Sequence, residues 1–145
     1  MIKTIAIASD HAGYLLKEKL KVFLKAEGYE CQDLGTDSEE SVDYPDFAKK
    51  VGDVVAKKQA DCGVLICGSG IGISIAANRN PKIRAALCHN AEIAKLSRQH
   101  NDANILVLGS RIVDEKTAIE CLKTFIDTDF EAGRHIKRVE KLGNI

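Results

Sequence analysis

The residues best suited to chemistry lie near the middle of the chain, where Cys67 is followed by the glycine-rich run Gly-Ser-Gly-Ile-Gly at residues 68–72. An apolar, β-branched run precedes the cysteine and a small-residue helical pattern follows the glycines, which predicts a buried strand, a tight loop and a helix. Three glycines let the backbone turn several N–H groups toward one point at a helix start. The stretch therefore predicts an anion site that a phosphate would fit, with a thiol facing it.

Better-known glycine-rich loops have other spacings. The G-x-G-x-G run differs from the dinucleotide pattern G-x-G-x-x-G, and no Gly-Lys-Ser/Thr follows it as in a P-loop. The next predicted strand, residues 83–87, does not end in the acid that binds a ribose hydroxyl. A cysteine-dependent phosphatase would need an arginine six residues after the thiol, where this chain has Ile73. These three classes are therefore disfavoured.

Composition limits the partners of the chain. Its 145 residues suit one domain, residues 1–145, and its 21 basic and 21 acidic residues cancel. No basic field favours nucleic acid or an anionic membrane, and no apolar run has transmembrane length, so we expect a cytoplasmic protein with a small-molecule partner. The five cysteines are odd in number and form no C-x-x-C pair. They predict reduced thiols and no zinc site, and we expect neither a metal nor another cofactor.

Strand and helix patterns alternate along the whole chain. The sequence predicts strands at residues 4–8, 29–34, 64–67, 83–87 and 104–108. It also predicts six helices. The first ends at Gly28, the second begins at Asp43-Tyr44-Pro45 and the third follows the glycine loop. The fourth spans residues 91–98, the fifth begins near its cap at Asp114, and the sixth spans residues 131–142. Five β-α units without a hairpin signal predict an α/β fold: a single doubly wound, Rossmann-like domain with a five-stranded parallel sheet, helices on both faces and a C-terminal helix.

In such folds ligands bind beyond the carboxyl ends of the strands. The polar residues at those ends, besides the Cys67 loop, are Asp10, His11, His89 and Arg111. His100 and Asn101 instead lie just before the fifth predicted strand, at the opposite edge of the sheet. We therefore predict that His100 serves the pocket of a neighbouring subunit, which implies a homodimer with shared sites.

The last predicted helix carries a second group of basic residues. Arg134 and Arg138 are four residues apart and share a helix face, with His135 beside them. Two guanidinium groups on one face suit a phosphate dianion, although a solvated charged face would have the same pattern.

Five motifs together resemble the ribose-5-phosphate isomerase B family. They are Ser-Asp-His-Ala-Gly (9–13), Asp-Tyr-Pro-Asp (43–46), Cys-Gly-Ser-Gly-Ile-Gly-Ile-Ser-Ile-Ala-Ala-Asn (67–78), Ser-Arg-Gln-His-Asn-Asp-Ala-Asn (97–104) and Gly-Arg-His (133–135). The motifs follow the order of the family and cover the chain almost end to end. Isomerases of galactose 6-phosphate and allose 6-phosphate share this fold, so the resemblance indicates the reaction class more closely than the sugar.

The resemblance implies a role for each candidate residue. It makes Cys67 the base that moves a proton between C1 and C2 through an enediolate, while His100, followed by Asn101, assists ring opening. A second branch of the family uses a glutamate six residues on, where this chain has Ile73, so the chain resembles the cysteine branch. The implied substrate-binding residues are Asp10 and His11 at the sugar end, Gly68, Ser69, Gly70, Ile71 and Gly72 at the oxyanion, and Arg111, Arg134 and Arg138 at the phosphate.

Three functions stay open on the sequence alone. The first is interconversion of ribose 5-phosphate and ribulose 5-phosphate in the non-oxidative pentose phosphate pathway. The second is the same reaction on allose or galactose 6-phosphate. The third is a non-catalytic sugar-phosphate or nucleotide sensor, which would have no use for a thiol facing its anion site. The sequence leaves dimer and tetramer open, and Asp43, Tyr44 and His89 stay outside the predicted catalytic set.

Overall fold

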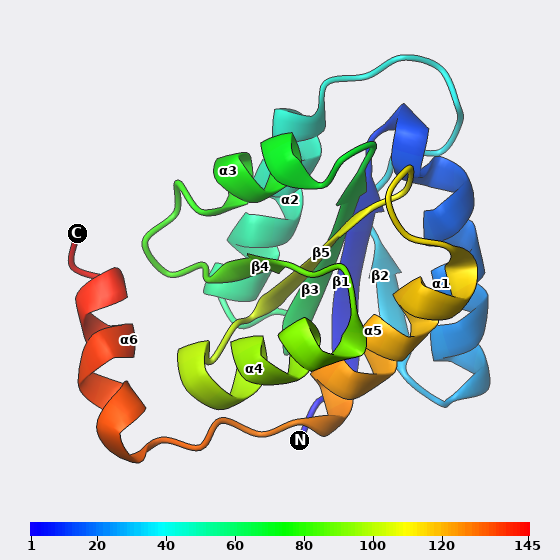
Figure 1. The fold of residues 1–145 in the computed structure, drawn as a ribbon. Coiled ribbons are helices and arrows are strands. Elements are labelled where there is room, and N and C mark those ends of the chain that lie inside the picture. Colours follow the sequence, from blue (N-terminus) through cyan, green and yellow to red (C-terminus); the bar gives the residue numbers. More distant parts are fainter.

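The computed structural model describes all 145 residues and has one sheet at its centre. Five strands, all parallel, lie in the order β2-β1-β3-β5-β4 (Figure 1). Their bounds are β1 Thr4–Ser9, β2 Glu30–Asp33, β3 Cys62–Cys67, β4 Ala85–Leu87 and β5 Ile105–Gly109. The predicted doubly wound parallel sheet is thereby confirmed.

Helices cover both faces of this sheet. The helices are α1 (Tyr14–Ala26), α2 (Tyr44–Ala56), α3 (Ile71–Ala77), α4 (Ala91–Asn101), α5 (Glu115–Asp127) and α6 (Ile136–Leu142), with 3₁₀ turns η1 (His11–Gly13) and η2 (Gly133–His135). One apolar core lies between the sheet and α1, α4 and α5, and a second lies between the sheet and α2 and α3. None of these helices has the length and apolar character needed to cross a membrane.

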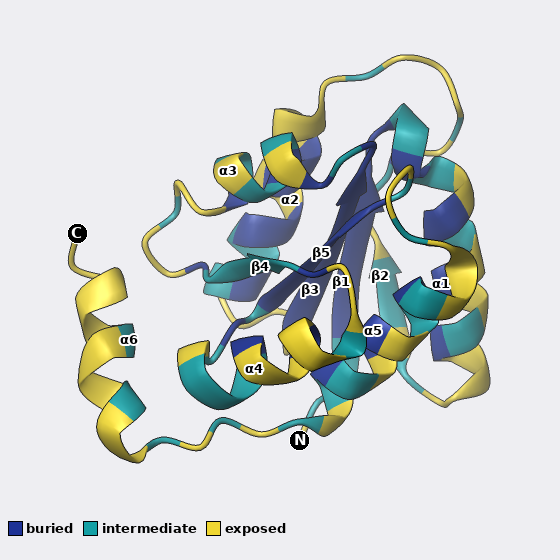
Figure 2. Ribbon diagram, viewed as in Figure 1, coloured by how far each residue is buried: buried dark blue, intermediate teal, exposed yellow.

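The central strands are buried on both faces, which explains their continuous apolar sequences. Every residue of β3 and of β5 is buried (Figure 2). Along β3, Val64 and Ile66 belong to the core under α1 and α5, whereas Leu65 and Cys67 belong to the core under α2 and α3. The alternation of side chains along a strand therefore turns Cys67 toward the helix that follows it.

Two predicted helix boundaries were wrong. Helix α4 continues to Asn101, three residues beyond the predicted end, and stops where Asp102 adopts the left-handed conformation (φ 47°). His100 therefore lies in the last helical turn. The last helix begins later than predicted, because Ala132 and Gly133 have φ of 59° and 57° and break the helical path. Glu131 consequently lies outside the helix, and α6 proper starts at Ile136.

Helix α6 stands apart from the rest of the chain. None of its residues is buried, and Ile136 and Leu142 are exposed (Figures 1 and 2). A hollow of about 710 Å³ lies beside it, and its lining includes Arg84, Asn101 and Leu142. The chain by itself therefore gives α6 little to pack against.

Candidate active site

The loops that follow β1, β3 and β5 are tied together at the carboxyl edge of the sheet. The backbone N–H of Asp10 donates to the carbonyl of Ile66 at 3.1 Å, and that of Ser110 donates to the carbonyl of Cys67 at 2.9 Å. The Ser110 hydroxyl also donates to the carbonyl of Ala12 at 2.8 Å. These bonds hold the three loops as one rim.

Cys67 is the last residue of β3 and is 4% exposed. Its Sγ accepts a hydrogen bond from the backbone N–H of Gly70 at 3.2 Å. Gly70 has a φ of +77°, and a Cβ there would lie 2.4 Å from Leu87 Cδ1 and 3.1 Å from the backbone nitrogen of Gly109. Only glycine fits this turn, so the glycine at position 70 sets the N–H that faces the sulfur.

Two backbone N–H groups of the loop already have hydrogen-bond partners. The hydroxyl oxygen of Ser69 accepts the N–H of Ile71 at 3.1 Å, so the amides of Gly70 and Ile71 both have partners within the loop. An enediolate oxygen would compete with the sulfur and the hydroxyl for these two donors. Its predicted binding by the amides of Gly68 to Gly72 stays a prediction.

Two side chains from other elements border the loop. A Cβ at Gly68 would lie 2.8 Å from Nη1 of Arg111, which places that guanidinium directly against the loop, as predicted for a residue of this edge. A Cβ at Gly72 would lie 2.6 Å from Cζ of Tyr44. Tyr44 stays outside the predicted catalytic set, yet it lies against the loop. Its place in the Asp-Tyr-Pro-Asp motif was the signal that could have included it.

Asp10 and His11 lie at the same edge, after β1. The buried Asp10 carboxylate accepts the N–H of Gly13 at 3.1 Å and so caps the turn η1. Nδ1 of His11 accepts the N–H of Val42 at 3.2 Å. A neutral His11 therefore carries its proton on Nε2. The exposed His89 follows β4 at this edge too.

The other cysteines are core residues. Burial raises the pKa of Cys62 and of Cys88 to about 12 and that of Cys121 to about 11. Burial also raises the pKa of Cys31, which is half-buried. Burial thus favours the protonated form of these four thiols, as expected of cysteines that pack in the cores.

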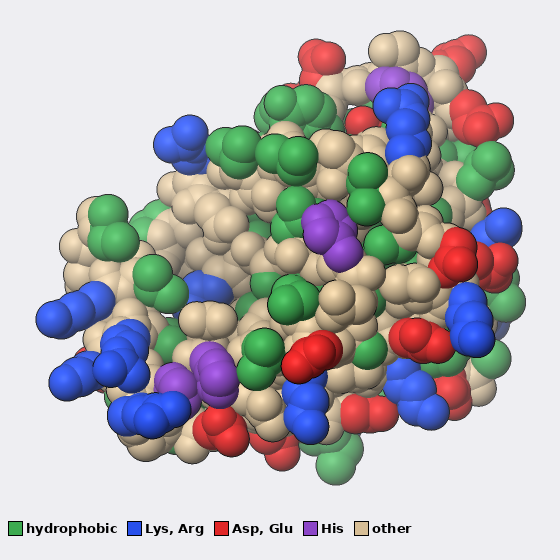
Figure 3. All heavy atoms as spheres, viewed as in Figure 1, with side chains coloured by type: hydrophobic (Ala, Val, Ile, Leu, Met, Phe, Trp, Pro, Cys, Tyr) green, Lys and Arg blue, Asp and Glu red, His purple; other side chains and the backbone are tan.

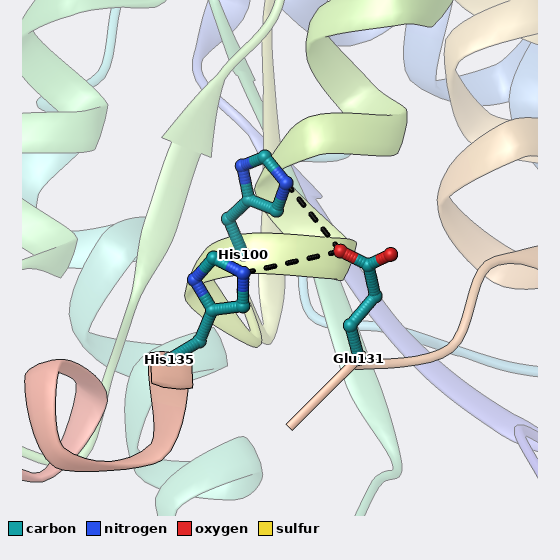
Figure 4. A group of neighbouring side chains, drawn as sticks. All are labelled: His100, Glu131 and His135. Carbon is teal, nitrogen blue, oxygen red and sulfur yellow. Dashed lines mark ion pairs between the residues drawn. The ribbon is translucent and has the colours of Figure 1, made fainter. Parts of the chain in front are cut away.

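A second cluster contains His100, Glu131 and His135 (Figure 4). The two imidazoles stack with ring centroids 4.5 Å apart and planes 14° from parallel. Nε2 of His100 lies 3.5 Å, and Nε2 of His135 3.9 Å, from the same Glu131 oxygen. Burial, together with the charges of His100, Arg134 and Arg138, lowers the pKa of His135. Lys and Arg side chains gather beside the histidines at the α6 end of the molecule (Figure 3).

The same three side chains are the candidate metal ligands of the chain, since their donor atoms lie within 4.8 Å of one another. Their geometry favours another arrangement. Both Nε2 atoms face the same Glu131 oxygen, and Arg134 and Arg138 add positive charge next to His135, which disfavours a cation there. The cluster fits a stacked ring pair that shares one carboxylate.

The two clusters lie at opposite edges of the sheet. Cys67 ends β3 at the carboxyl edge, whereas His100 lies in the last turn of α4, shortly before β5 begins. The structure thus brings Asp10, His11 and Arg111 together with the cysteine loop. It places Asn101, Arg134 and Arg138 in the segments that carry His100. The predicted separation of His100 from the cysteine edge is confirmed.

Residues 5–142 match the model of the ribose/galactose isomerase family. The chain belongs to this family. Ribose-5-phosphate isomerase B of Escherichia coli is 45% identical over 97% of this chain and 95% of its own. A putative sugar phosphate isomerase of Rickettsia conorii is 48% identical over 95% of this chain and 96% of its own.

Solved structures of ribose/galactose isomerases share the whole fold. A ribose 5-phosphate isomerase of Thermotoga maritima is 52% identical with a TM-score of 0.97, covering 99% of both chains. Ribose-5-phosphate isomerase B of Mycoplasma genitalium, solved with bound ribulose 5-phosphate, is 41% identical with a TM-score of 0.94, covering 99% of this chain and 96% of its own. The residues that match the family model include those of both clusters, from Cys67 to His135.

Proposed function

We propose that this ribose/galactose isomerase interconverts ribose 5-phosphate and ribulose 5-phosphate through an enediolate. The observation that carries the proposal is the thiol of Cys67, held by the Gly70 N–H in a loop that Arg111 borders, at the edge of the sheet where Asp10 and His11 also lie. Relatives named for the same reaction, one of them solved with ribulose 5-phosphate, support it.

In the proposed mechanism Cys67 is the base. Its thiolate takes the proton from C2 of the open aldose while the C1 carbonyl becomes the oxygen of the enediolate. The proton on O2 passes to O1, and the sulfur returns its proton to C1 as C2 becomes the carbonyl, so atoms and charge balance. The loop amides from Gly68 to Gly72 and the Ser69 hydroxyl are the donors for the enediolate oxygens. Asp10 and His11 border the sugar end.

We propose that each site is completed by a second copy of the chain. His100 and Asn101 lie at the edge opposite Cys67, and the hollow of about 710 Å³ borders Asn101 next to the unsupported α6. A partner packed there would bring its His100 to this chain's rim to open the sugar ring. It would also bring its Arg134 and Arg138, from η2 and α6, toward Arg111.

The phosphate then lies between arginines from two chains. Arg111 borders the loop of one subunit, and Arg134 and Arg138 come from η2 and α6 of the other. Guanidinium groups bind a phosphate dianion through paired, charge-assisted hydrogen bonds. Neutralising the dianion also limits its repulsion of a thiolate at Cys67.

A mixing experiment tests the shared site. Cys67→Ala and His100→Ala homodimers are each inactive under the proposal, but a mixed dimer has one complete site and one site lacking both groups. Random exchange at equal amounts makes half of the dimers mixed, so about a quarter of the wild-type activity should return. No recovery after verified exchange would refute sharing.

Substrate assays decide between the remaining functions. EDTA-treated protein is incubated with ribose 5-phosphate, allose 6-phosphate or galactose 6-phosphate, and the ketose is followed over time. We expect turnover of the pentose, because the proposed role is that of a cytoplasmic enzyme in the non-oxidative pentose phosphate pathway. Turnover of a hexose alone would keep the mechanism and change the substrate. Folded protein that turns over none of the three, yet binds them, would be a sensor.

A further inference from the structure

Glu131 is the one acidic group that both stacked histidines face (Figure 4). It comes from the loop before η2, while His100 comes from the end of α4. The side chain of His135 is only 12% exposed, and that of His100 is 39% exposed. His135 thus covers one face of the more exposed ring, and the carboxylate lies at the Nε2 edge.

This arrangement determines which nitrogen of His100 carries a proton. An ionised carboxylate only accepts hydrogen bonds, so the nitrogen facing Glu131 is the one favoured to hold N–H in a neutral ring. That nitrogen is Nε2, at 3.5 Å. Nδ1 lies on the other side of the ring and keeps its lone pair (Figure 4). Stacking on His135 restrains rotation of the ring, which is otherwise a soft torsion.

We propose that Glu131 and His135 are positioning residues that hold His100 with Nε2 protonated, so that Nδ1 exchanges the proton during ring opening. The inference rests on the proposed function, in which His100 opens the sugar ring. Nδ1 takes the proton of the anomeric hydroxyl as the C1–O4 bond breaks and the C1 carbonyl forms. The same proton then returns from Nδ1 to O4. The transient imidazolium is stabilised by the Glu131 carboxylate.

The pair of assays that tests this separates ring opening from proton transfer at carbon. Ribose 5-phosphate is a closed furanose and must be opened. Ribulose 5-phosphate cannot close such a ring because its O5 is esterified, so exchange of solvent deuterium into its C1 needs the enediolate step alone. Glu131→Gln should lower kcat for ribose 5-phosphate about tenfold or more and leave C1 exchange within about twofold. Glu120→Gln, at an exposed position of α5, is the matched control and should change neither rate.

Variants of the stacked ring test the second half of the proposal. His135→Phe keeps an aromatic face against His100, whereas His135→Ala removes it. We expect His135→Phe to keep most of the kcat for ribose 5-phosphate and His135→Ala to lose as much as Glu131→Gln. Equal losses in the two variants would refute a role for stacking.

A spectroscopic measurement needs no substrate. Nitrogen-15 shifts of His100 at pH 8 should show the proton on Nε2 in the wild-type protein and a mixture of both tautomers in Glu131→Gln. An unchanged tautomer, or equal losses of turnover and exchange in Glu131→Gln, would overturn the proposal. A wild-type protein without turnover or exchange would instead refute the proposed function, and the nitrogen shifts would still decide whether Glu131 sets the tautomer.

Discussion

Gly70→Ala adds one methyl group at the turn that faces the sulfur of Cys67. An L-residue at a φ of +77° costs about 1–2 kcal/mol. The methyl would also lie 2.4 Å from Leu87 Cδ1, which can rotate away, and 3.1 Å from the backbone nitrogen of Gly109, which is part of β5 and cannot. Overpacking of this kind adds about 1–3 kcal/mol. We expect a total loss of roughly 2–5 kcal/mol in the free energy of unfolding.

Urea denaturation at fixed protein concentration measures this loss. Gly28→Ala is the matched control, because Gly28 has a φ of +86° with nothing within 4 Å of its added Cβ. That variant reports the backbone cost alone, about 1–2 kcal/mol. The difference between the two variants is therefore the packing cost at the loop. A Gly70→Ala loss no larger than that of Gly28→Ala would refute the close approach of β5 to the loop.

The same variant tests the link between loop and thiol. A protein that keeps even about 2 kcal/mol of stability is more than about 95% folded, so activity lost beyond the unfolded fraction reports on the site. Displacing the Gly70 N–H from Sγ should lower kcat about tenfold or more, as expected when a preorganised donor is removed. Gly28→Ala should retain the wild-type kcat. If Gly70→Ala is destabilised but fully active, the hydrogen bond from the Gly70 N–H to the Cys67 sulfur is not needed for catalysis.

Three further predictions concern stability and reactivity. Asp33→Asn removes the charge that lies 2.8 Å from the fully buried ammonium of Lys17 and should cost about 2–4 kcal/mol by urea denaturation. Asp53→Asn, at an exposed pair with Lys49, is the control and should leave the stability almost unchanged. Burial raises the pKa of Asp33, but hydrogen bonds from Lys17, Lys21 and the Gly35 N–H outweigh it and hold that pKa below the usual value of an aspartate. The unfolded state therefore binds more protons, so this stabilisation is present above about pH 4 and is lost as the pH falls through the pKa of the folded state. Asp33→Asn should accordingly flatten the loss of stability on the acid side, as urea denaturation at several pH values would show. At pH 8 Cys62 and Cys88 should resist iodoacetamide until the protein unfolds, as peptide mass spectrometry would show, and labelling of either in the folded state would contradict their buried, protonated condition.

The sheet and the cysteine edge were predictable because their signals are local. β3 and β5 are continuous apolar runs, and such runs in a chain of alternating strands and helices imply a parallel sheet covered on both faces. The G-x-G-x-G run predicted a tight turn within residues 68–72, and the structure has a positive φ there, at Gly70. The edge of the sheet then followed from topology, which also separated His100 from Cys67.

The second cluster could not be predicted because its contacts join segments that are distant in the sequence. Glu131 lies 31 positions after His100, and no periodicity links a loop residue to the end of α4. The predicted end of α4 and the predicted start of the last helix were wrong for a related reason. Asp102 ends α4 in a left-handed conformation that glycine usually supplies, and Ala132 adopts positive φ although alanine favours helix. Tertiary contacts, not local preference, decide the conformation of such residues.

The isolation of α6 has a consequence for how this family can change its substrate. No buried side chain binds α6 to either core, so substitutions can shift this helix without disturbing the folding of the sheet. Under the shared-site proposal, the span from thiol to phosphate is set by how two surfaces meet. One further sugar carbon lengthens that span by about 1.5 Å, within reach of a small displacement of α6. The position of the C-terminal helix would then set the length of sugar phosphate that fits. Substitutions at the subunit contact could thus change the preference between pentose and hexose phosphates while the residues around Cys67 stay the same.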